Sequence, residues 1–127
     1  MRNDEGSTEA MAIDTGHAQL SGKELDAIIV GTTVRGLYRG GFRYNVFVDR
    51  DGSLEGKNHV GSHNFGTWLL DMKAHTFTVT WRNGWDHTTT RAYNFGDEVR
   101  FFDADTGLWR TTFSGFELGR KPLEVFD

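Results

Sequence analysis

After residue 31 the chain alternates short runs of β-forming residues with turn-forming segments, and this spacing constrains the fold more than any other feature. Turn pairs such as Asp51-Gly52 and Asn83-Gly84 tolerate the positive φ angles that tight hairpins need. Strands and turns that recur at intervals of about 8–12 residues predict an antiparallel sandwich or barrel. The expected strands are Thr32–Tyr38, Phe42–Asp49, Ser53–His59, Phe65–Asp71, Thr76–Arg82, His87–Asn94, Glu98–Asp103 and Leu108–Phe116.

Within these runs, apolar and polar residues alternate in the way expected of strands with one buried face. In the fifth run Phe77, Val79 and Trp81 fall on one side, whereas Thr78 and Thr80 fall on the other. Eight such strands joined by short hairpins can close on themselves, which removes the exposed edges of an open sheet. We therefore predict an all-β fold, an eight-stranded antiparallel up-and-down barrel whose interior is filled or holds one small ligand.

One short helix is expected before the first strand. Residues Ser21–Val30 begin with a serine that can cap a helix, and Glu24 completes a capping box with Ser21. The preceding residues are rich in acids and lack an apolar pattern, which is typical of a mobile segment. We predict a flexible acidic tail over residues 1–20 and a single barrel domain over residues 21–127.

The order of these elements resembles that of a known group of barrels. A short helix, then Gly31-Thr32-Thr33, then consecutive hairpins with Gly66-Thr67-Trp68 inside one strand, resembles the small bacterial lipocalin-like (calycin) barrels over residues 21–116. In lipocalins proper the Gly-x-Trp pattern lies on the first strand, whereas here it falls on the fourth. The chain is also distantly similar to phenolic acid decarboxylases, which are cofactor-free lyases with tyrosines and an arginine inside a similar barrel. The resemblance implies a pocket for a small molecule.

Composition excludes several classes of function. The 127-residue chain has no cysteine, so it has no thiol nucleophile and no thiolate metal site. Its net charge is −4 and it has no basic stripe, which argues against nucleic-acid and membrane partners. No segment approaches the roughly 18 apolar residues of a membrane span, and the first 20 residues lack a secretory pattern. We expect a cytoplasmic protein, and homo-oligomerisation stays open.

The sixth run, His87–Asn94, contains the candidate residues that are hardest to place. One phase of the alternation turns His87, Arg91 and Tyr93 into the barrel, and the other turns Thr88 and Thr90 inward. An arginine inside a closed barrel keeps its charge and needs an anionic partner, either an internal carboxylate or the acid group of a ligand. The inward phase would therefore make Arg91 a ligand-binding residue.

Other candidates are aromatic or lie near a turn. Tyr44 falls on the apolar face of its strand, where its hydroxyl would need a partner. His59 and His63 flank a longer turn, where they are more simply explained as surface residues than as metal ligands, and we predict no metal and no cofactor. Trp85 lies in a hairpin, where it could cover the barrel end or contact a partner. The remaining candidate ligand-binding residues are Asn58, Trp68, Trp81, Phe101 and Trp109.

These residues support two leading hypotheses. In the first, the protein is a cofactor-free lyase or isomerase that acts on a small, partly apolar, anionic molecule. Arg91 would anchor the acid group, Tyr44 or Tyr93 would donate a proton, and the base would be His59, His63 or His87. In the second, the barrel is a non-catalytic carrier or sensor of the same kind of molecule. A third hypothesis, a filled structural barrel that contacts other proteins, predicts no cavity.

Overall fold

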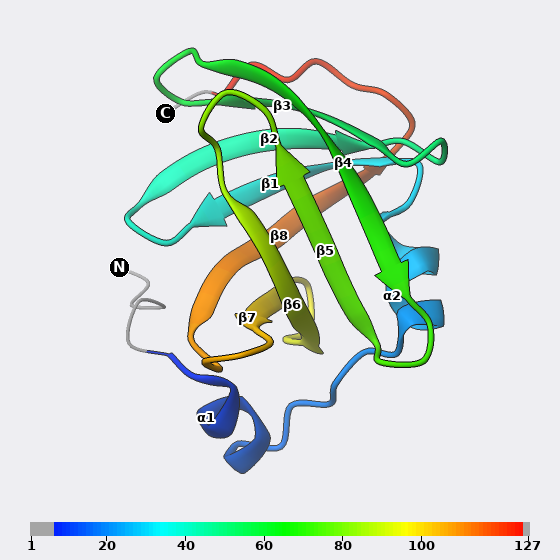
Figure 1. The fold of residues 1–127 in the computed structure, drawn as a ribbon, viewed down its shortest axis with the longest axis vertical. Helices are drawn as coiled ribbons and strands as arrows, with labels where there is room; N and C mark the ends of the chain where they lie inside the picture. The colour runs from blue at the N-terminus through cyan, green and yellow to red at the C-terminus, as the bar shows by residue number, and fades with distance from the viewer. Residues whose placement is uncertain (1–6, 126–127) are drawn as a thin grey trace.

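The computed structural model describes residues 7–125, which form a closed barrel of eight antiparallel strands, and the predicted fold class is confirmed (Figure 1). Each strand pairs with the next along the chain, and the last pairs with the first. The strand bounds agree closely with those expected from the sequence. They are β1 (Thr32–Tyr38), β2 (Phe42–Val48), β3 (Ser53–Asn58), β4 (His63–Asp71), β5 (Thr76–Trp81), β6 (His87–Asn94), β7 (Val99–Asp103) and β8 (Trp109–Leu118).

Up-and-down connection gathers alternate hairpins at opposite ends of the barrel. Helix α2 (Gly22–Ile29) lies at the end formed by the β2–β3, β4–β5 and β6–β7 turns, where it sends Leu25 and Ile29 into the core. The predicted capping box is confirmed, because Ser21 and Glu24 each bond the backbone N–H of the other. The opposite end, formed by the β1–β2, β3–β4, β5–β6 and β7–β8 turns, is not covered by a described helix.

A second helix, α1 (Glu9–Asp14), lies where the sequence predicted a flexible tail. It packs outside the barrel near the β7–β8 hairpin, with Ala12 against Phe102 and Trp109 (Figure 1). Burial of this apolar contact stabilises a helix that is too short to be stable alone. Residues 1–6 of the predicted tail lie outside the described residues. Within residues 7–125, neither helix has the length and apolar content needed to span a membrane.

The barrel core consists mainly of aliphatic side chains and three phenylalanines. Phe101 is fully buried and lies 4.7 Å from Phe113 and 5.6 Å from Phe77, measured between ring centroids. These rings come from β7, β8 and β5, so they connect β5 across the interior with the β7–β8 pair. Such edge-to-face and tilted arrangements are favourable for aromatic rings, and the three rings pack in one core with the buried side chains of helix α2.

A β-bulge between β7 and β8 reverses the expected facing of part of β8. Phe101 pairs with Thr111, but the next residue, Phe102, pairs with Trp109, so Arg110 is an extra residue on β8. The prediction that Trp109 faces the interior is therefore wrong, because its side chain lies outside the barrel in the cluster beneath α1. The same bulge turns Arg110 toward the interior, where it lines a cavity.

Candidate functional site

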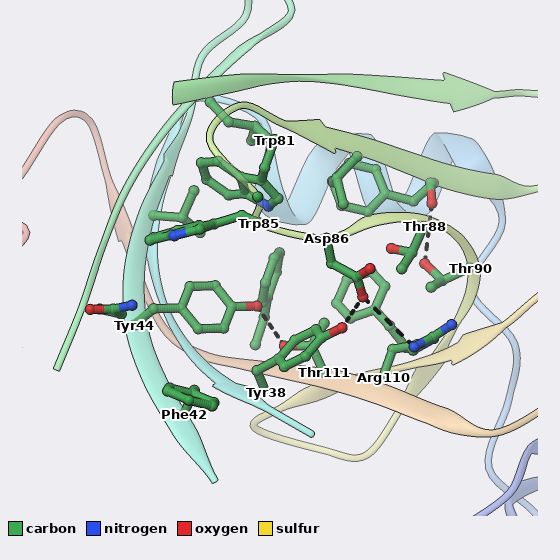
Figure 2. Close-up of a pocket in the computed structure, with 18 residues that line it drawn as sticks. Tyr38, Phe42, Tyr44, Trp81, Trp85, Asp86, Thr88, Thr90, Arg110 and Thr111 are labelled. Atoms are coloured by element: carbon green, nitrogen blue, oxygen red, sulfur yellow. Dashed lines mark hydrogen bonds and ion pairs between the residues drawn. The ribbon is translucent and has the colours of Figure 1, made fainter. Parts of the chain in front are cut away.

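A cavity of about 450 Å³ occupies the uncovered half of the barrel (Figure 2). Its inner end meets the three core phenylalanines, and its mouth lies between the β1–β2 and β5–β6 hairpins. The volume falls within the range of roughly 300–1,000 Å³ that is usual for small-molecule sites. The lining residues are Tyr38, Phe42, Tyr44, Val46, Leu54, Asn58, Phe77, Val79, Trp81, Gly84, Trp85, Asp86, Thr88, Thr90, Phe101, Arg110, Thr111 and Phe113.

Aromatic rings make up much of the cavity wall near the mouth. Trp81, at the end of β5, and Trp85, in the β5–β6 hairpin, have ring centroids 4.8 Å apart. Tyr44, from β2, contacts Phe113 edge-to-face at a centroid distance of 6.4 Å. Trp85 is partly buried although it lies in a turn, because its ring folds back over the barrel. The wall can therefore stack against a flat or apolar ligand.

Two glycines inside strands make room for these rings. A Cβ atom on Gly36 would lie 2.2 Å from the Tyr44 ring, which faces it across the β1–β2 ladder. A Cβ atom on Gly56 would lie 2.8 Å from the Trp81 ring. Both distances are shorter than real carbon contacts, so any larger residue would push an aromatic ring into the cavity. The shape of the site therefore depends on the absence of side chains at these two positions.

Three side chains from different strands and turns form a polar group at the mouth. The Tyr38 hydroxyl, at the end of β1, donates a hydrogen bond to the Asp86 carboxylate, which lies 3.7 Å from Arg110 Nη1 (Figure 2). The backbone N–H of His87 also donates to Asp86 Oδ1, at 3.1 Å. Asp86 therefore keeps a fixed position although its side chain is 38% exposed.

Arg110 makes its direct hydrogen bonds to a second carboxylate. Its Nε and Nη2 atoms donate to Asp103 Oδ2 at 3.1 and 2.9 Å. Burial alone would raise the pKa of Asp103, but backbone N–H groups of Thr106 and Asp105, together with Arg110, outweigh burial and lower this pKa. Asp103 is consequently ionised at neutral pH. One guanidinium thus lies between two carboxylates, so negative charge is in excess among these three side chains.

Hydroxyl groups deeper in the cavity donate their protons to other protein atoms. Thr111 donates to the Leu37 carbonyl at 3.0 Å, so it accepts the hydrogen bond from Tyr44, at 2.5 Å. Thr90 donates to the Phe77 carbonyl at 3.2 Å. Burial raises the pKa of the Tyr44 phenol well above its usual value, which keeps the phenol neutral. These hydroxyls therefore offer mainly oxygen lone pairs to a ligand.

Four of the residues proposed from the sequence line the cavity. They are Tyr44, Asn58, Trp81 and Phe101. The Asn58 side-chain oxygen accepts backbone N–H bonds from Val60 and Ser62, at 3.2 and 2.9 Å, so the β3–β4 turn holds this amide in place. Trp68 lies elsewhere: its indole N–H donates to the Asp49 carbonyl at 2.7 Å, next to the β2–β3 turn.

The histidines proposed as catalytic bases do not line the cavity. His59 Nδ1 accepts from the backbone N–H of Arg43 at 3.0 Å, and His63 Nε2 lies 2.8 Å from Glu55 on the barrel surface. His87 contacts Thr80 Oγ1 at 2.8 Å, also on the outer face. The predicted facing of β6 that turns His87 inward is wrong, because Thr88 and Thr90 of this strand line the cavity. No group of three or more His, Cys, Asp or Glu among residues 7–125 could hold a metal ion.

The observed facing of β6 also places Arg91 and Tyr93 outside the barrel, so the prediction that they point inward is wrong. Arg91 Nε and Nη2 donate to the Glu9 carboxylate at 2.6 and 2.8 Å, and the Tyr93 hydroxyl donates to it at 2.8 Å. The anionic partner that Arg91 requires is therefore a side chain of helix α1, which the sequence analysis assigned to a flexible tail. Neither residue can touch a ligand in the cavity.

The polar group at the mouth was not identified from the sequence. Tyr38 shares a strand face with the buried Val34, and this alternation was a usable sign that it points inward. Asp86 follows Trp85, for which the sequence predicted a cover over the barrel end or a contact with a partner, but no role was predicted for Asp86 itself. Arg110 gave no sign, since only the bulge turns it into the cavity.

A second hollow, of about 440 Å³, lies on the outer face of β1 and β2, beside residues 121–125. Side chains of both charges line it, including Arg35, Glu117, Lys121 and Glu124, and its aromatic content is low. The interior cavity therefore remains the candidate site. No protein-family model, curated protein or solved structure matches the chain.

Proposed function

We propose that the barrel binds one small, ring-containing and largely apolar molecule in the interior cavity and acts as a non-catalytic carrier or sensor. The observation that carries this proposal is the 450 Å³ cavity itself, which has aromatic walls and polar groups confined to a few fixed positions. The closed eight-stranded barrel is compatible with the calycin-like architecture that the sequence resembles, and the assignment to that group is part of the proposal.

The alternative is cofactor-free lyase or isomerase chemistry, and the cavity favours binding over this alternative. Catalysis by the residues first considered needs Arg91 and a histidine next to Tyr44, but these side chains lie outside the cavity. The raised pKa of Tyr44 makes it a poor proton donor near neutral pH. The alternative therefore depends on Tyr38 and Asp86, which form a hydrogen-bonded pair at the mouth.

Ligand-observed NMR with neutral ring compounds tests the proposal. We would mix the full chain with 2-phenylethanol, indole-3-ethanol and cyclohexanol, and measure saturation transfer to each compound. Val79→Trp adds a large ring inside the cavity and should abolish the transfer. Leu69→Trp adds the same ring on the outer wall of β4, where the side chain is 67% exposed, and should bind like the wild type.

The NMR experiment distinguishes the binding function from the enzymatic alternative. Binding that Val79→Trp removes and Leu69→Trp preserves supports the carrier or sensor function, provided that both variants keep the wild-type circular dichroism spectrum. Binding that Val79→Trp leaves intact contradicts it, and so does a lack of binding by these neutral compounds and by the charged ring compounds tested below. Conversion of a bound probe into a new compound over hours, lost in Asp86→Asn, would favour the enzymatic alternative.

A further inference from the structure

We infer that the ligand of this cavity carries a positive charge: it is a protonated organic amine attached to a ring. The inference rests on the proposed binding function and specifies its ligand class. It replaces the anionic ligand expected when Arg91 was placed inside the barrel. Three independent features of the cavity support it, namely charge, aromatic lining and hydrogen-bonding direction.

The charge at the mouth is the first feature. Arg110 donates two hydrogen bonds to Asp103 and lies farther from Asp86, at 3.7 Å, so its positive charge is already balanced. Asp86 adds a second negative charge on the cavity side. An anionic ligand would have to approach Asp86 or separate it from Arg110, and both cost electrostatic energy. A cationic ligand would instead complete the charge balance.

The aromatic lining is the second feature. Trp81, Trp85, Tyr38, Tyr44 and Phe42 all line the same half of the cavity as Asp86, and Figure 2 shows the labelled rings arranged around the space that this carboxylate faces. The faces of aromatic rings attract cations, most strongly for tryptophan, and such rings bind quaternary ammonium groups in many proteins. A carboxylate among several rings is therefore well suited to an ammonium group.

The direction of the hydrogen bonds is the third feature. Tyr38 donates to Asp86, Tyr44 donates to Thr111, and Thr111 and Thr90 donate to backbone carbonyls. The remaining hydrogen-bonding capacity of these hydroxyls lies in their lone pairs, which accept bonds from a ligand. A protonated amine has donors and no acceptor, so it matches these groups better than a carboxylate does.

A series of three probes with one ring and different charges tests the inference. They are 2-phenylethylamine, 2-phenylethanol and 3-phenylpropionate, titrated at pH 7 and followed by protein NMR shifts. We expect the amine to bind about tenfold more tightly than the alcohol, and the propionate to bind most weakly. This comparison needs no variant, so it does not depend on the folding of any mutant.

Asp86→Asn then isolates the carboxylate. The substitution keeps the size of the side chain and should weaken the amine about tenfold while changing alcohol binding less than twofold. Asp105→Asn is the matched control, because it removes one negative charge from an exposed position on the neighbouring β7–β8 turn. It should leave the affinities of all three probes within twofold of their wild-type values.

The outcomes separate failure of the ligand class from failure of the function. Equal binding of the amine and the alcohol, or tighter binding of the propionate, overturns the cationic ligand and leaves the binding function in place. Loss of amine binding in both asparagine variants would mean that overall charge, rather than Asp86, attracts the amine, and this also overturns the inference. If none of the three probes binds and the neutral compounds above also fail, the proposed function itself is wrong.

Discussion

The barrel contains two groups built from the same three residue types, an arginine, a carboxylate and a tyrosine. Glu9, Arg91 and Tyr93 form one group on the outer wall, which we call the helix triad. The other group, at the cavity mouth, consists of Tyr38, Asp86 and Arg110, and we call it the mouth triad. The two groups differ in how completely the protein surrounds and saturates the carboxylate.

In the helix triad each member is hydrogen-bonded to another member of the group. Both Glu9 oxygens accept from Arg91, Tyr93 adds a third bond, and Arg91 also donates to the Ala104 carbonyl at 2.9 Å. Only 13% of the Glu9 side chain is exposed. Such a bidentate, partly buried pair fixes the position of one element on another. The helix triad is therefore a structural fastening of α1.

In the mouth triad the carboxylate is oriented but less fully engaged. Asp86 accepts from Tyr38 and from the backbone of His87, whereas Arg110 gives its two short bonds to Asp103. The side chain of Asp86 is 38% exposed, which is about three times the exposed fraction of Glu9. Residues of the same kinds therefore stabilise the fold where they bond one another fully, and we propose that they serve binding where they face a cavity.

The largest expected difference between the triads is in stability. Glu9→Gln should lower the free energy of unfolding by about 1–3 kcal/mol, because Arg91 loses a charged, bidentate partner. Asp86→Asn should change it by less than about 1 kcal/mol, since exposed charge pairs contribute little. Urea unfolding at pH 7, monitored by circular dichroism, measures both values. Equal losses in the two variants would contradict the distinction.

A smaller effect on stability is expected when the pH is lowered. Hydrogen bonds from Arg91 lower the pKa of Glu9 below its ordinary value of 4.5, and they outweigh the opposing effect of burial. A lowered carboxyl pKa adds stability that is complete above the unfolded-state pKa and is lost as pH falls through the folded-state pKa. The gap in unfolding free energy between wild type and Glu9→Gln should therefore be constant from pH 7 to 5.5 and should shrink below about pH 4.5.

The shared acids of the two proteins cancel in this difference, so it reports on Glu9 alone. Urea unfolding at pH 7, 5.5, 4 and 3.5 gives the required values. A gap that stays constant down to pH 3.5, or that widens with acid, would show that the Glu9 carboxylate is not what fastens α1 to the barrel.

Much of the fold could be predicted from the sequence because its signals are local. Alternation and turn chemistry lie within a few neighbouring residues, so β1 was placed at its observed bounds and β5 within one residue. The capping box at Ser21 is also local. Helix α1 could not be predicted, because its six residues depend on contacts with a wall that is distant in the sequence.

Less of the candidate site could be predicted, because tertiary structure decides which side chains of a strand face the cavity. Strand β6 has polar residues on both faces: Thr88 and Thr90 line the cavity, while Arg91 is neutralised by α1. Alternation alone cannot choose between two such faces. Arg110 was missed for a related reason, since a one-residue bulge changes the face of a strand without a clear mark in the sequence.

The smallest expected effects come from the two tyrosines. Tyr93→Phe removes one hydrogen bond from a nearly buried carboxylate and should cost about 1 kcal/mol of stability, without affecting probe binding. Tyr38→Phe should cost less, about 0.5 kcal/mol, but should change the amine affinity, because Asp86 loses a donor that orients it.

Titration of the phenols gives an independent check on the environment assigned to Tyr93 in the helix triad. Burial, and then the hydrogen bond to Glu9, raise the pKa of Tyr93 to about 12. The ultraviolet titration of wild type should therefore contain a phenol that ionises near pH 12 and is missing from Tyr93→Phe. If Tyr93→Phe altered amine binding while Tyr38→Phe did not, the roles assigned to the two triads would be reversed. Two substitutions that each remove a single oxygen atom therefore test the structural role of the helix triad and the binding role proposed for the mouth triad.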